Sequence, residues 1–317
     1  MKSWKTRAKY IKTQIINSTK KINIVGGRYG LSSKNTTPSQ IKAIFDYMDN
    51  NKLLAQEIAK IAEVASYLWQ RGWAEYNGGN ISVNVTETLS EEERKVEAIG
   101  DKVTLPTILE ELKGSIFYVT GTGKRMRYVA QSPWENGALI RISECGDYFE
   151  VIYKNCIKPT SELPSHLSMH NYLKSIGRDC KVVLHTHPTD LVALTHSKQW
   201  LDSEAITNML WSMIPECRII TPRGVGIVPY QIPGTMALAN ATIEQLAKHD
   251  VVFWEKHGIL ATGRDVVDCF DVIDTLSKSA QIYINAKMAG FEPEGMCKKD
   301  LDDLVPAFGL EKYYNEN

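Results

Sequence analysis

The stretch VVLHTHP at residues 182–188 is an apolar run that ends in two histidines one residue apart. Such a run is typical of a buried strand, and side chains two apart on a strand point to the same face. His185 and His187 can therefore reach one ion. A second apolar run, in VVFWEKHG at residues 251–258, brings His257 to the end of another strand. Catalytic zinc sites commonly use three protein ligands, so we expect these three histidines to bind a metal. An isolated His-x-His motif would be a surface accident about as often as a metal site.

Strand and helix patterns extend from this run in both directions. The sequence predicts strands at residues 81–85, 116–119, 139–142, 148–153, 182–185, 218–220, 226–230 and 251–254. It predicts helices at residues 53–65, 165–173, 235–247 and 266–288, a mostly helical segment at 190–214, and a largely irregular segment at 86–111. Mixed strands and helices without an internal repeat predict a layered α/β domain.

The charges are unevenly distributed along the 317 residues. Residues 1–45 hold ten Lys or Arg and no acidic side chain, which leaves 27 basic against 37 acidic residues in the remainder. Residues 46–317 therefore carry a net negative charge, which makes them an unsuitable partner for nucleic acid. No apolar stretch approaches the roughly 18–20 residues of a membrane span, and no secretory signal follows the basic start. We therefore expect a cytoplasmic protein, with its six scattered cysteines reduced.

The first 47 residues form a separate basic segment. Residues 21–45, KINIVGGRYGLSSKNTTPSQIKAIF, resemble a short piece of the pyruvate:ferredoxin oxidoreductases but are too short to carry that activity. The glycines of this segment match neither a dinucleotide-binding nor a Walker motif. An amphipathic helix pattern begins shortly after Met48. We therefore expect residues 1–47 to be an appendage outside the fold and residues 48–317 to be the functional domain.

Three turns can gather anions, because glycine-rich turns and helix starts present unpaired N–H groups. They are Asn77-Gly78-Gly79-Asn80, Thr120-Gly121-Thr122-Gly123-Lys124 and Thr160-Ser161. Each alone is more often an ordinary turn, but with a metal triad they indicate a phosphorylated small molecule. Glu162 follows the third turn at a predicted helix start. It is either a helix-capping carboxylate or a general base facing the metal.

The motifs NGGN, TGTGK, PTSELPSH, HTHP and WEKHG, in that order, resemble the class II sugar-phosphate aldolases. The resemblance spans about residue 48 to about residue 310, and the flanking words SELPSH, NMLWSMIPE and VVFWEKHG are similar to the rhamnulose-1-phosphate branch. It implies a three-layer αβα fold with a central mixed, largely antiparallel sheet. It also implies a homotetramer, whose active sites are completed at subunit contacts.

The resemblance assigns roles to particular residues. His185, His187 and His257 correspond to the ligands of one Zn²⁺ per subunit, and Glu162 corresponds to the catalytic acid/base. Glu216 matches a second carboxylate that acts at a neighbouring subunit's active site, although it could equally be a structural ion-pair partner. The residues that correspond to the substrate phosphate site are Asn77, Gly79, Asn80, Thr122, Gly123, Thr160 and Ser161.

The implied reaction is reversible cleavage of L-rhamnulose 1-phosphate to dihydroxyacetone phosphate and L-lactaldehyde, without a Schiff-base lysine. Lys124 and Lys256 are then electrostatic or solvated. The sequence itself gives His166, His170, His196 and His249 no strand-end context, and it places the first two on the predicted helix after Pro164, where they are structural or exposed. The alternatives are an aldolase for L-fuculose 1-phosphate, an epimerase or dehydratase of another sugar phosphate, and a metal-free adducin-like binding module. A metal-dependent amidohydrolase fits poorly, because that class places its His-x-His motif on an early strand, whereas here the motif lies mid-chain.

Overall fold

The computed structural model describes residues 50–153 and 155–314, in which nine strands form one sheet of order β2-β5-β4-β3-β1-β6-β9-β8-β7. Every neighbouring pair is antiparallel except β7 and β8, which are parallel. The sheet is therefore mixed and largely antiparallel, as the resemblance implied. The strands are β1 (Asn80–Asn84), β2 (Val103–Thr104), β3 (Ile116–Thr120), β4 (Gly137–Ile142), β5 (Tyr148–Tyr153), β6 (Val182–Thr186), β7 (Val225–Val228), β8 (Val251–Trp254) and β9 (Gly258–Gly263).

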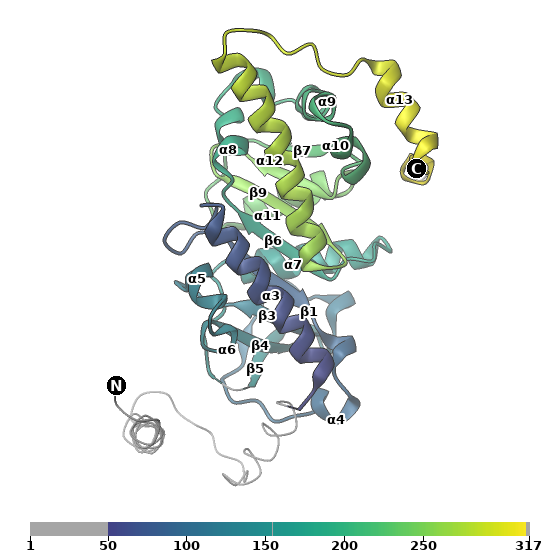
Figure 1. The fold of residues 1–317 in the computed structure, drawn as a ribbon. Helices are drawn as coiled ribbons and strands as arrows, with labels where there is room; N and C mark the ends of the chain where they lie inside the picture. Colours follow the sequence, from purple (N-terminus) through teal and green to yellow (C-terminus); the bar gives the residue numbers. More distant parts are fainter. Residues whose placement is uncertain (1–49, 154, 315–317) are drawn as a thin grey trace, which may run out of the picture. The chain divides into compact units, whose positions relative to one another are not determined.

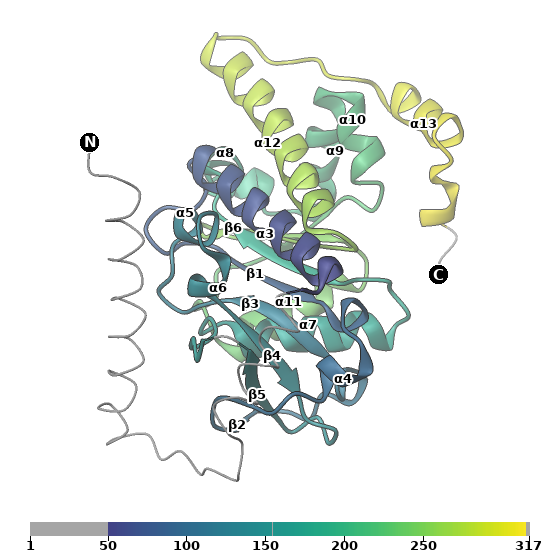
Figure 2. The same cartoon turned by 60° about the horizontal axis from the view of Figure 1, so that its bottom comes forward.

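Helices cover both faces of this sheet and complete a three-layer αβα arrangement (Figures 1 and 2). The long helices α3 (Lys52–Gln70) and α12 (Val266–Met288) lie on one face, together with α8 (Thr189–Leu194), α9 (Ser203–Met213) and α10 (Pro215–Ile220). The helices α7 (Leu163–Ser175) and α11 (Met236–Leu246) pack together on the other face. The shorter helices are α4 (Glu91–Arg94), α5 (Met126–Val129), α6 (Pro133–Asn136) and α13 (Lys298–Ala307), with 3₁₀ turns at Thr86–Thr88, Glu110–Leu112, Lys198–Trp200 and Leu310–Tyr313.

Local sequence explains why the long helices begin where they do. The Asn51 side chain accepts a hydrogen bond from the backbone N–H of Leu54 and caps α3. Asp265 caps α12 in the same way through the N–H of Val267. These caps satisfy backbone donors that a helix N-terminus otherwise leaves unpaired. In α3 the buried side chains recur every three or four residues, which is the spacing that the sequence predicted.

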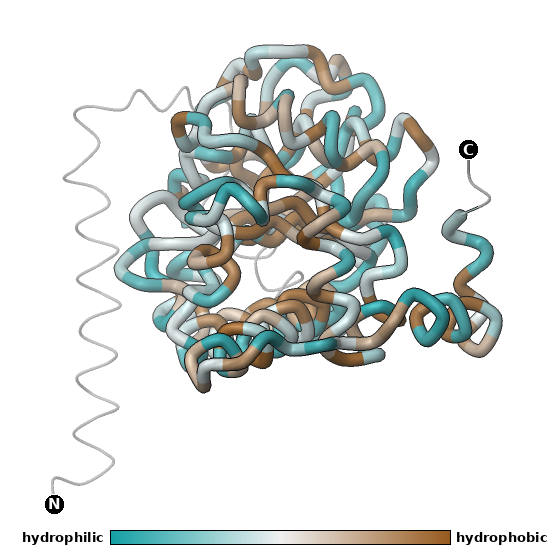
Figure 3. Tube along the Cα trace, turned by 90° about the horizontal axis from the view of Figure 1, so that it is seen from above, coloured by the Kyte–Doolittle hydropathy of each residue, from teal (hydrophilic) through white to brown (hydrophobic). Residues whose placement is uncertain are grey.

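The apolar core lies between the sheet and its helices, and hydrophobic segments gather in the interior of the molecule (Figure 3). One cluster joins α7 to β3, β4 and β5, through residues such as Leu167, Phe117 and Ile140. A second cluster joins α7 and α11 to β6, β8 and β9, through Met169 and Val183 among others. The helix α7 thus contributes to both clusters, and its position on the sheet is fixed along its length.

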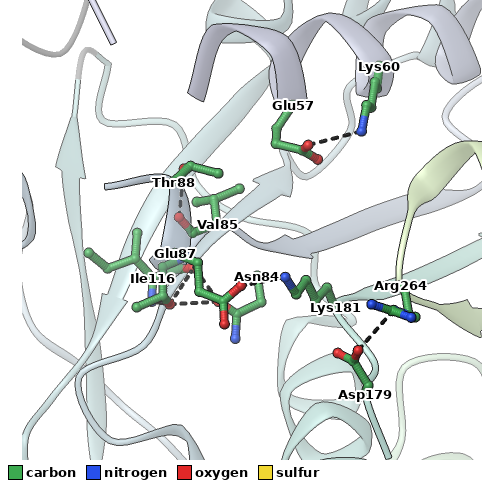
Figure 4. A network of polar contacts seen from close by, with 11 residues as sticks. Glu57, Lys60, Asn84, Val85, Glu87, Thr88, Ile116, Asp179, Lys181 and Arg264 are labelled. Carbon is green, nitrogen blue, oxygen red and sulfur yellow. Dashed lines mark hydrogen bonds and ion pairs between the residues drawn. The ribbon is translucent and has the colours of Figure 1, made fainter. Parts of the chain in front are cut away.

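A group of polar contacts lies near the start of β6 (Figure 4). Lys181 pairs with Glu87, and Arg264 pairs with Asp179, with largely exposed side chains in both pairs. Exposed ion pairs of this kind contribute about 0–1 kcal/mol each. His185 and His187, two of the three histidines expected to bind a metal, lie at and just beyond the opposite end of the same strand, so these pairs do not contact them.

The sequence prediction was wrong in one segment and incomplete in others. Residues 218–220 are helical rather than extended, as the end of α10. The Arg218 guanidinium packs over the Trp211 ring, with its carbon 3.6 Å from the ring centre, and this contact favours the helical conformation. The β-branched pair at 219–220 favours a strand, but tertiary packing overrides local propensity. The strand β9 and the helix α13 were not predicted, and α4 and β2 interrupt the segment expected to be irregular.

Other expectations concern the molecule as a whole. All six cysteines are free thiols. Within the described residues, no helix combines the length and apolar character needed to cross a membrane. The expected appendage at residues 1–47, including the segment 21–45, lies outside the described residues, so its separation from the domain stays a prediction.

Candidate active site

Two histidines project from the end of β6 toward the face covered by α7. Along β6 the side chains alternate, so that Val183 packs in the core beneath α7 and α11 while His185 continues on the same face. His187 comes directly after the strand, and its backbone N–H donates to the carbonyl of Trp73. The Thr186 hydroxyl donates to that same carbonyl, so the loop before β1 is tied to the histidine-bearing strand.

The third histidine comes from the hairpin that joins β8 to β9. Since β9 pairs with β6, the hairpin lies beside the end of β6. One ligand nitrogen from each of His185, His187 and His257 lies within 4.8 Å of the others. The sequence thus predicted correctly that these three side chains meet, and together they can bind a metal ion.

Hydrogen bonds to the outer ring nitrogens fix how two of these imidazoles point. His185 Nδ1 lies 2.9 Å from the carbonyl of Ile259, and His187 Nδ1 lies 2.7 Å from the Glu75 carboxylate. Both acceptors require a protonated Nδ1, which leaves both Nε2 atoms as bare lone pairs in the neutral rings. These two Nε2 atoms are only 3.1 Å apart. A cation between them relieves the repulsion, and ligand nitrogens about 2.0–2.1 Å from zinc lie at a comparable separation.

The environment favours the neutral form of two of these rings, His185 and His257, and the neutral form is the one that binds metal. Burial and the neighbouring imidazoles hold the pKa of His185 well below its usual value. Burial and His187 lower the pKa of His257 to about 4. In addition, His257 Nδ1 is buried and has no hydrogen-bond partner among the described residues. Buried polar atoms normally find a partner, so this nitrogen fits a site whose metal completes it.

Gly258 allows the three rings to approach one another. A Cβ atom at this position would lie 2.8 Å from His185 Cε1, 2.8 Å from His187 Cδ2 and 2.6 Å from the carbonyl oxygen of Thr186. These separations are far below van der Waals contact. Any residue larger than glycine would therefore displace these histidines.

Glu162 lies at the start of α7, on the same side of the sheet as the histidines. Asn80 Nδ2 donates a 2.8 Å hydrogen bond to Glu162 Oε2, so the carboxylate is held against β1. The side chain of Glu162 makes no capping hydrogen bond to the helix. The structure therefore favours the site-facing interpretation of this carboxylate over the capping one.

The glycine-rich turns meet beside the histidines. Gly121 pairs with Pro159 in a short antiparallel bridge, and the N–H of Thr122 donates to the carbonyl of Lys158. Gly79 has φ of +76°, and a Cβ there would lie 2.8 Å from the carbonyl oxygen of His185. Only glycine combines this left-handed backbone with so close an approach. The turns are thus held against one another and against β6.

The histidines, Glu162 and the glycine-rich turns line one cavity of about 310 Å³. Glu162, the three histidines and every residue predicted for the phosphate site line it, and Glu75, Tyr76, Gly78 and Gly121 complete the wall. Glu216 does not line it; it lies exposed on α10. Its expected place in a neighbouring subunit's site stays a prediction, as do the catalytic and phosphate-binding roles.

Comparison with known proteins shows which family contains this chain. Residues 59–284 match the family described as Class II Aldolase and Adducin N-terminal domain. The chain belongs to this family. A rhamnulose-1-phosphate aldolase from Bacteroides thetaiotaomicron is 50% identical over 266 residues, which cover 84% of this chain and 98% of that protein. One from Enterococcus faecalis is 33% identical over 262 residues, covering 82% and 94% of the two chains.

Solved structures of the class II aldolase family share the fold. A sugar-phosphate aldolase from Thermotoga maritima superposes with a TM-score of 0.67 at 30% identity, covering 76% of this chain and 99% of that one. An L-fuculose 1-phosphate aldolase has a TM-score of 0.53 at 18% identity, covering 80% and 96%, and shows similarity of fold alone.

Sequence reasoning missed two groups of residues in this class II aldolase fold. Glu75 supports His187, but nothing in its local pattern marks it, since its role depends on how the imidazole is oriented. His166 and His170 were expected to be structural or exposed; both are buried, in agreement with the structural alternative, and what the sequence missed is their shared partner. The Ser82 hydroxyl lies 2.8 Å from His166 Nδ1 and 2.9 Å from His170 Nε2, and joins β1 to α7 behind Glu162.

Proposed function

We propose that this protein is a metal-dependent aldolase, a carbon–carbon lyase that reversibly cleaves L-rhamnulose 1-phosphate to dihydroxyacetone phosphate and L-lactaldehyde. The observation that carries the proposal is the single cavity in which a histidine triad, an oriented carboxylate and several anion-binding turns converge. The similarity to rhamnulose-1-phosphate aldolases over most of both chains supports the choice of sugar.

The phosphate end of the substrate is assigned to the three turns. Asn77, Gly79 and Asn80 lie on one wall of the cavity, and the turns at 122–123 and 160–161 lie on another. Their backbone N–H groups and short polar side chains suit a phosphate, and the start of α7 adds the positive end of a helix dipole. Binding there fixes the distance from the phosphate to the reacting carbons.

The carboxylate of Glu162 is assigned the proton at the carbon that becomes the reactive carbon of dihydroxyacetone phosphate. In the cleavage direction that carbon gains a proton, and in the condensation direction it loses one. The hydrogen bond from Asn80 holds the carboxylate in one orientation, so that one oxygen remains free to take part. A general acid or base that is positioned in this way contributes about 10²–10⁴-fold to a rate.

The histidine triad is assigned one Zn²⁺ per subunit. When bound, this ion supplies a Lewis acid that stabilises the negative charge developing on the substrate as the C3–C4 bond breaks. We also propose that the enzyme is a homotetramer in which Glu216 handles the proton on the aldehyde oxygen at a neighbour's site. It acts in the cytoplasm, where the charge of a sugar phosphate prevents its escape across a bilayer.

The test is release of dihydroxyacetone phosphate from L-rhamnulose 1-phosphate, followed with a coupled reductase. The expected result is turnover that disappears with a chelator and returns with zinc. Metal binding without turnover of this sugar, but with turnover of L-fuculose 1-phosphate, would reassign the substrate. A protein that binds no metal at the three histidines would contradict the aldolase proposal and favour an adducin-like binding module.

A further inference from the structure

The candidate phosphate end of the cavity contains no cationic side chain. Among the residues that line the cavity there is no lysine or arginine, and two of them, Glu75 and Glu162, are carboxylates. A phosphate monoester carries about −1.5 to −2 charges at pH 7. Neutral donors alone therefore leave most of this charge without a counter-charge in the wall.

The guanidinium of Arg125 lies beside Tyr76, which is part of the cavity wall. The guanidinium of Arg125 lies 4.9 Å from the centre of the Tyr76 ring, within the range of a cation–π contact. Tyr76 lines the cavity next to Asn77, and Arg125 follows the Gly123 turn by two residues. The contact therefore joins two of the three loops assigned to the phosphate.

Tyr76 combines an uncommon backbone conformation with a largely exposed side chain. Its φ is +48°, in the left-handed region that tyrosine rarely adopts, and its side chain is 72% exposed. Strained residues of this kind persist where the surrounding structure and function require them. In the described part of the chain Arg125 forms no ion pair with a carboxylate, so its charge is available to a ligand.

We propose that Arg125 is the phosphate-binding cation of this site and that Tyr76 is the positioning residue that holds its guanidinium at the cavity mouth. Guanidinium groups bind phosphate oxygens through several N–H donors in a fixed plane, and stacking on an aromatic ring keeps that plane in place. The inference rests on the proposed function for the identity of the sugar, but not for the binding of phosphate itself.

The experiment measures inorganic phosphate binding to the zinc-loaded full chain by calorimetry, and the KM and kcat for L-rhamnulose 1-phosphate. Arg125→Met should raise the phosphate dissociation constant and the KM about tenfold, with kcat changed less than about twofold, because a charge-assisted hydrogen bond is lost from binding. Arg127→Met is the matched control. It removes the same charge two residues away, where the guanidinium stacks on Trp69 and Tyr128 instead, and should change neither constant by more than about twofold.

Two variants of Tyr76 separate positioning from general structure. Tyr76→Phe keeps the ring and should retain the phosphate dissociation constant, whereas Tyr76→Leu should raise it although every charge remains. Equal effects of Arg125→Met and Arg127→Met would overturn the proposal. So would loss of phosphate binding on Lys124→Met without any loss on Arg125→Met. If the wild-type chain binds phosphate through Arg125 but does not cleave L-rhamnulose 1-phosphate, the proposed substrate fails and this inference stands.

Discussion

Replacing Gly258 with alanine tests whether the hairpin glycine sets the geometry of the metal site. The backbone of Gly258 is not in the left-handed region, so alanine meets no conformational penalty there. The only obstacle is steric, because the new methyl group would lie 2.8 Å from carbon atoms of both His185 and His187. Any effect of the substitution therefore reports on this contact.

The size of the effect follows from these distances. An ordinary contact begins near 3.4 Å, so each ring must retreat by about 0.6 Å, whereas metal–ligand distances tolerate about 0.2 Å. The carbonyl of Thr186 cannot move away, because its strand is paired on both sides with β1 and β9. We expect zinc affinity to fall at least 10–100-fold, about 1.4–2.7 kcal/mol, as for loss of a group that orients a ligand.

The assay is competition for zinc against a chromophoric chelator, together with the absorption spectrum of the cobalt-substituted protein. Gly290→Ala is the matched control, since it forces alanine into a backbone of φ +91° but meets no atom within 4 Å. It should lose some stability and keep its zinc affinity. Wild-type zinc affinity and an unchanged cobalt spectrum in Gly258→Ala would refute the steric argument.

Four further predictions concern the catalytic carboxylate, the ligand support, the buried histidines and the appendage. Glu162→Gln should keep its zinc, measured by elemental analysis, but lose about 10²–10⁴-fold in kcat; near wild-type turnover would remove this residue from proton transfer. Glu75→Gln should weaken zinc binding about 10–100-fold in the chelator competition, because the amide is a poorer acceptor for the imidazole N–H; unchanged affinity would show that this carboxylate does not support the ligand. Burial lowers the pKa of both His166 and His170 to about 3, so the unfolded chain binds more protons between about pH 3 and 6.5. Urea unfolding should therefore show stability falling on acidification below pH 6.5, by up to about 1.4 kcal/mol per pH unit for each histidine, and His170→Gln should reduce that slope. A chain that begins at Met48 should match the full chain in kcat and KM, whereas a large loss of turnover would place residues 1–47 within the functional unit.

The grouping of the three histidines could be predicted from the sequence because most of its signals are local. His185 and His187 follow an apolar strand with a period of two, and this period alone places both rings on one face. His257 follows a second apolar run with the same character. The remaining step, that these two strand ends lie together, depends on the strand β9, which pairs with both β6 and β8 and was not predicted.

The supporting contacts could not be predicted, because they depend on which element packs on which. Ser82 meets His166 and His170 only because β1 pairs with β6 beneath α7, and no spacing in the sequence encodes that register. Likewise, Glu75 becomes a partner of His187 only once the loop before β1 folds onto the end of β6. Such polar contacts between distant segments come from tertiary structure rather than local propensity.

The error at residues 218–220 has a similar origin. Two consecutive isoleucines favour extended structure, but Pro215 begins a helix and Arg218 is buried over an aromatic ring. The strand β9 was missed because Gly258–Gly263 contains two glycines and a short apolar run directly after a predicted strand. A hairpin of this kind is difficult to separate from a single strand by pattern alone.

The pairing of β6 with β9 has a consequence for how the protein is made. His187 and His257 are separated by 70 residues, which takes roughly 4–14 s to synthesise at 5–20 residues per second. Until β9 exists, one side of β6 lacks its neighbour and the His-x-His pair lacks the third imidazole. A growing chain can therefore offer an ion no more than two of its final ligands, and stable capture of the metal follows translation of the hairpin. Supply of the proposed metal ion then acts only on a chain that already contains the hairpin, and cannot guide the earlier strands to their partners.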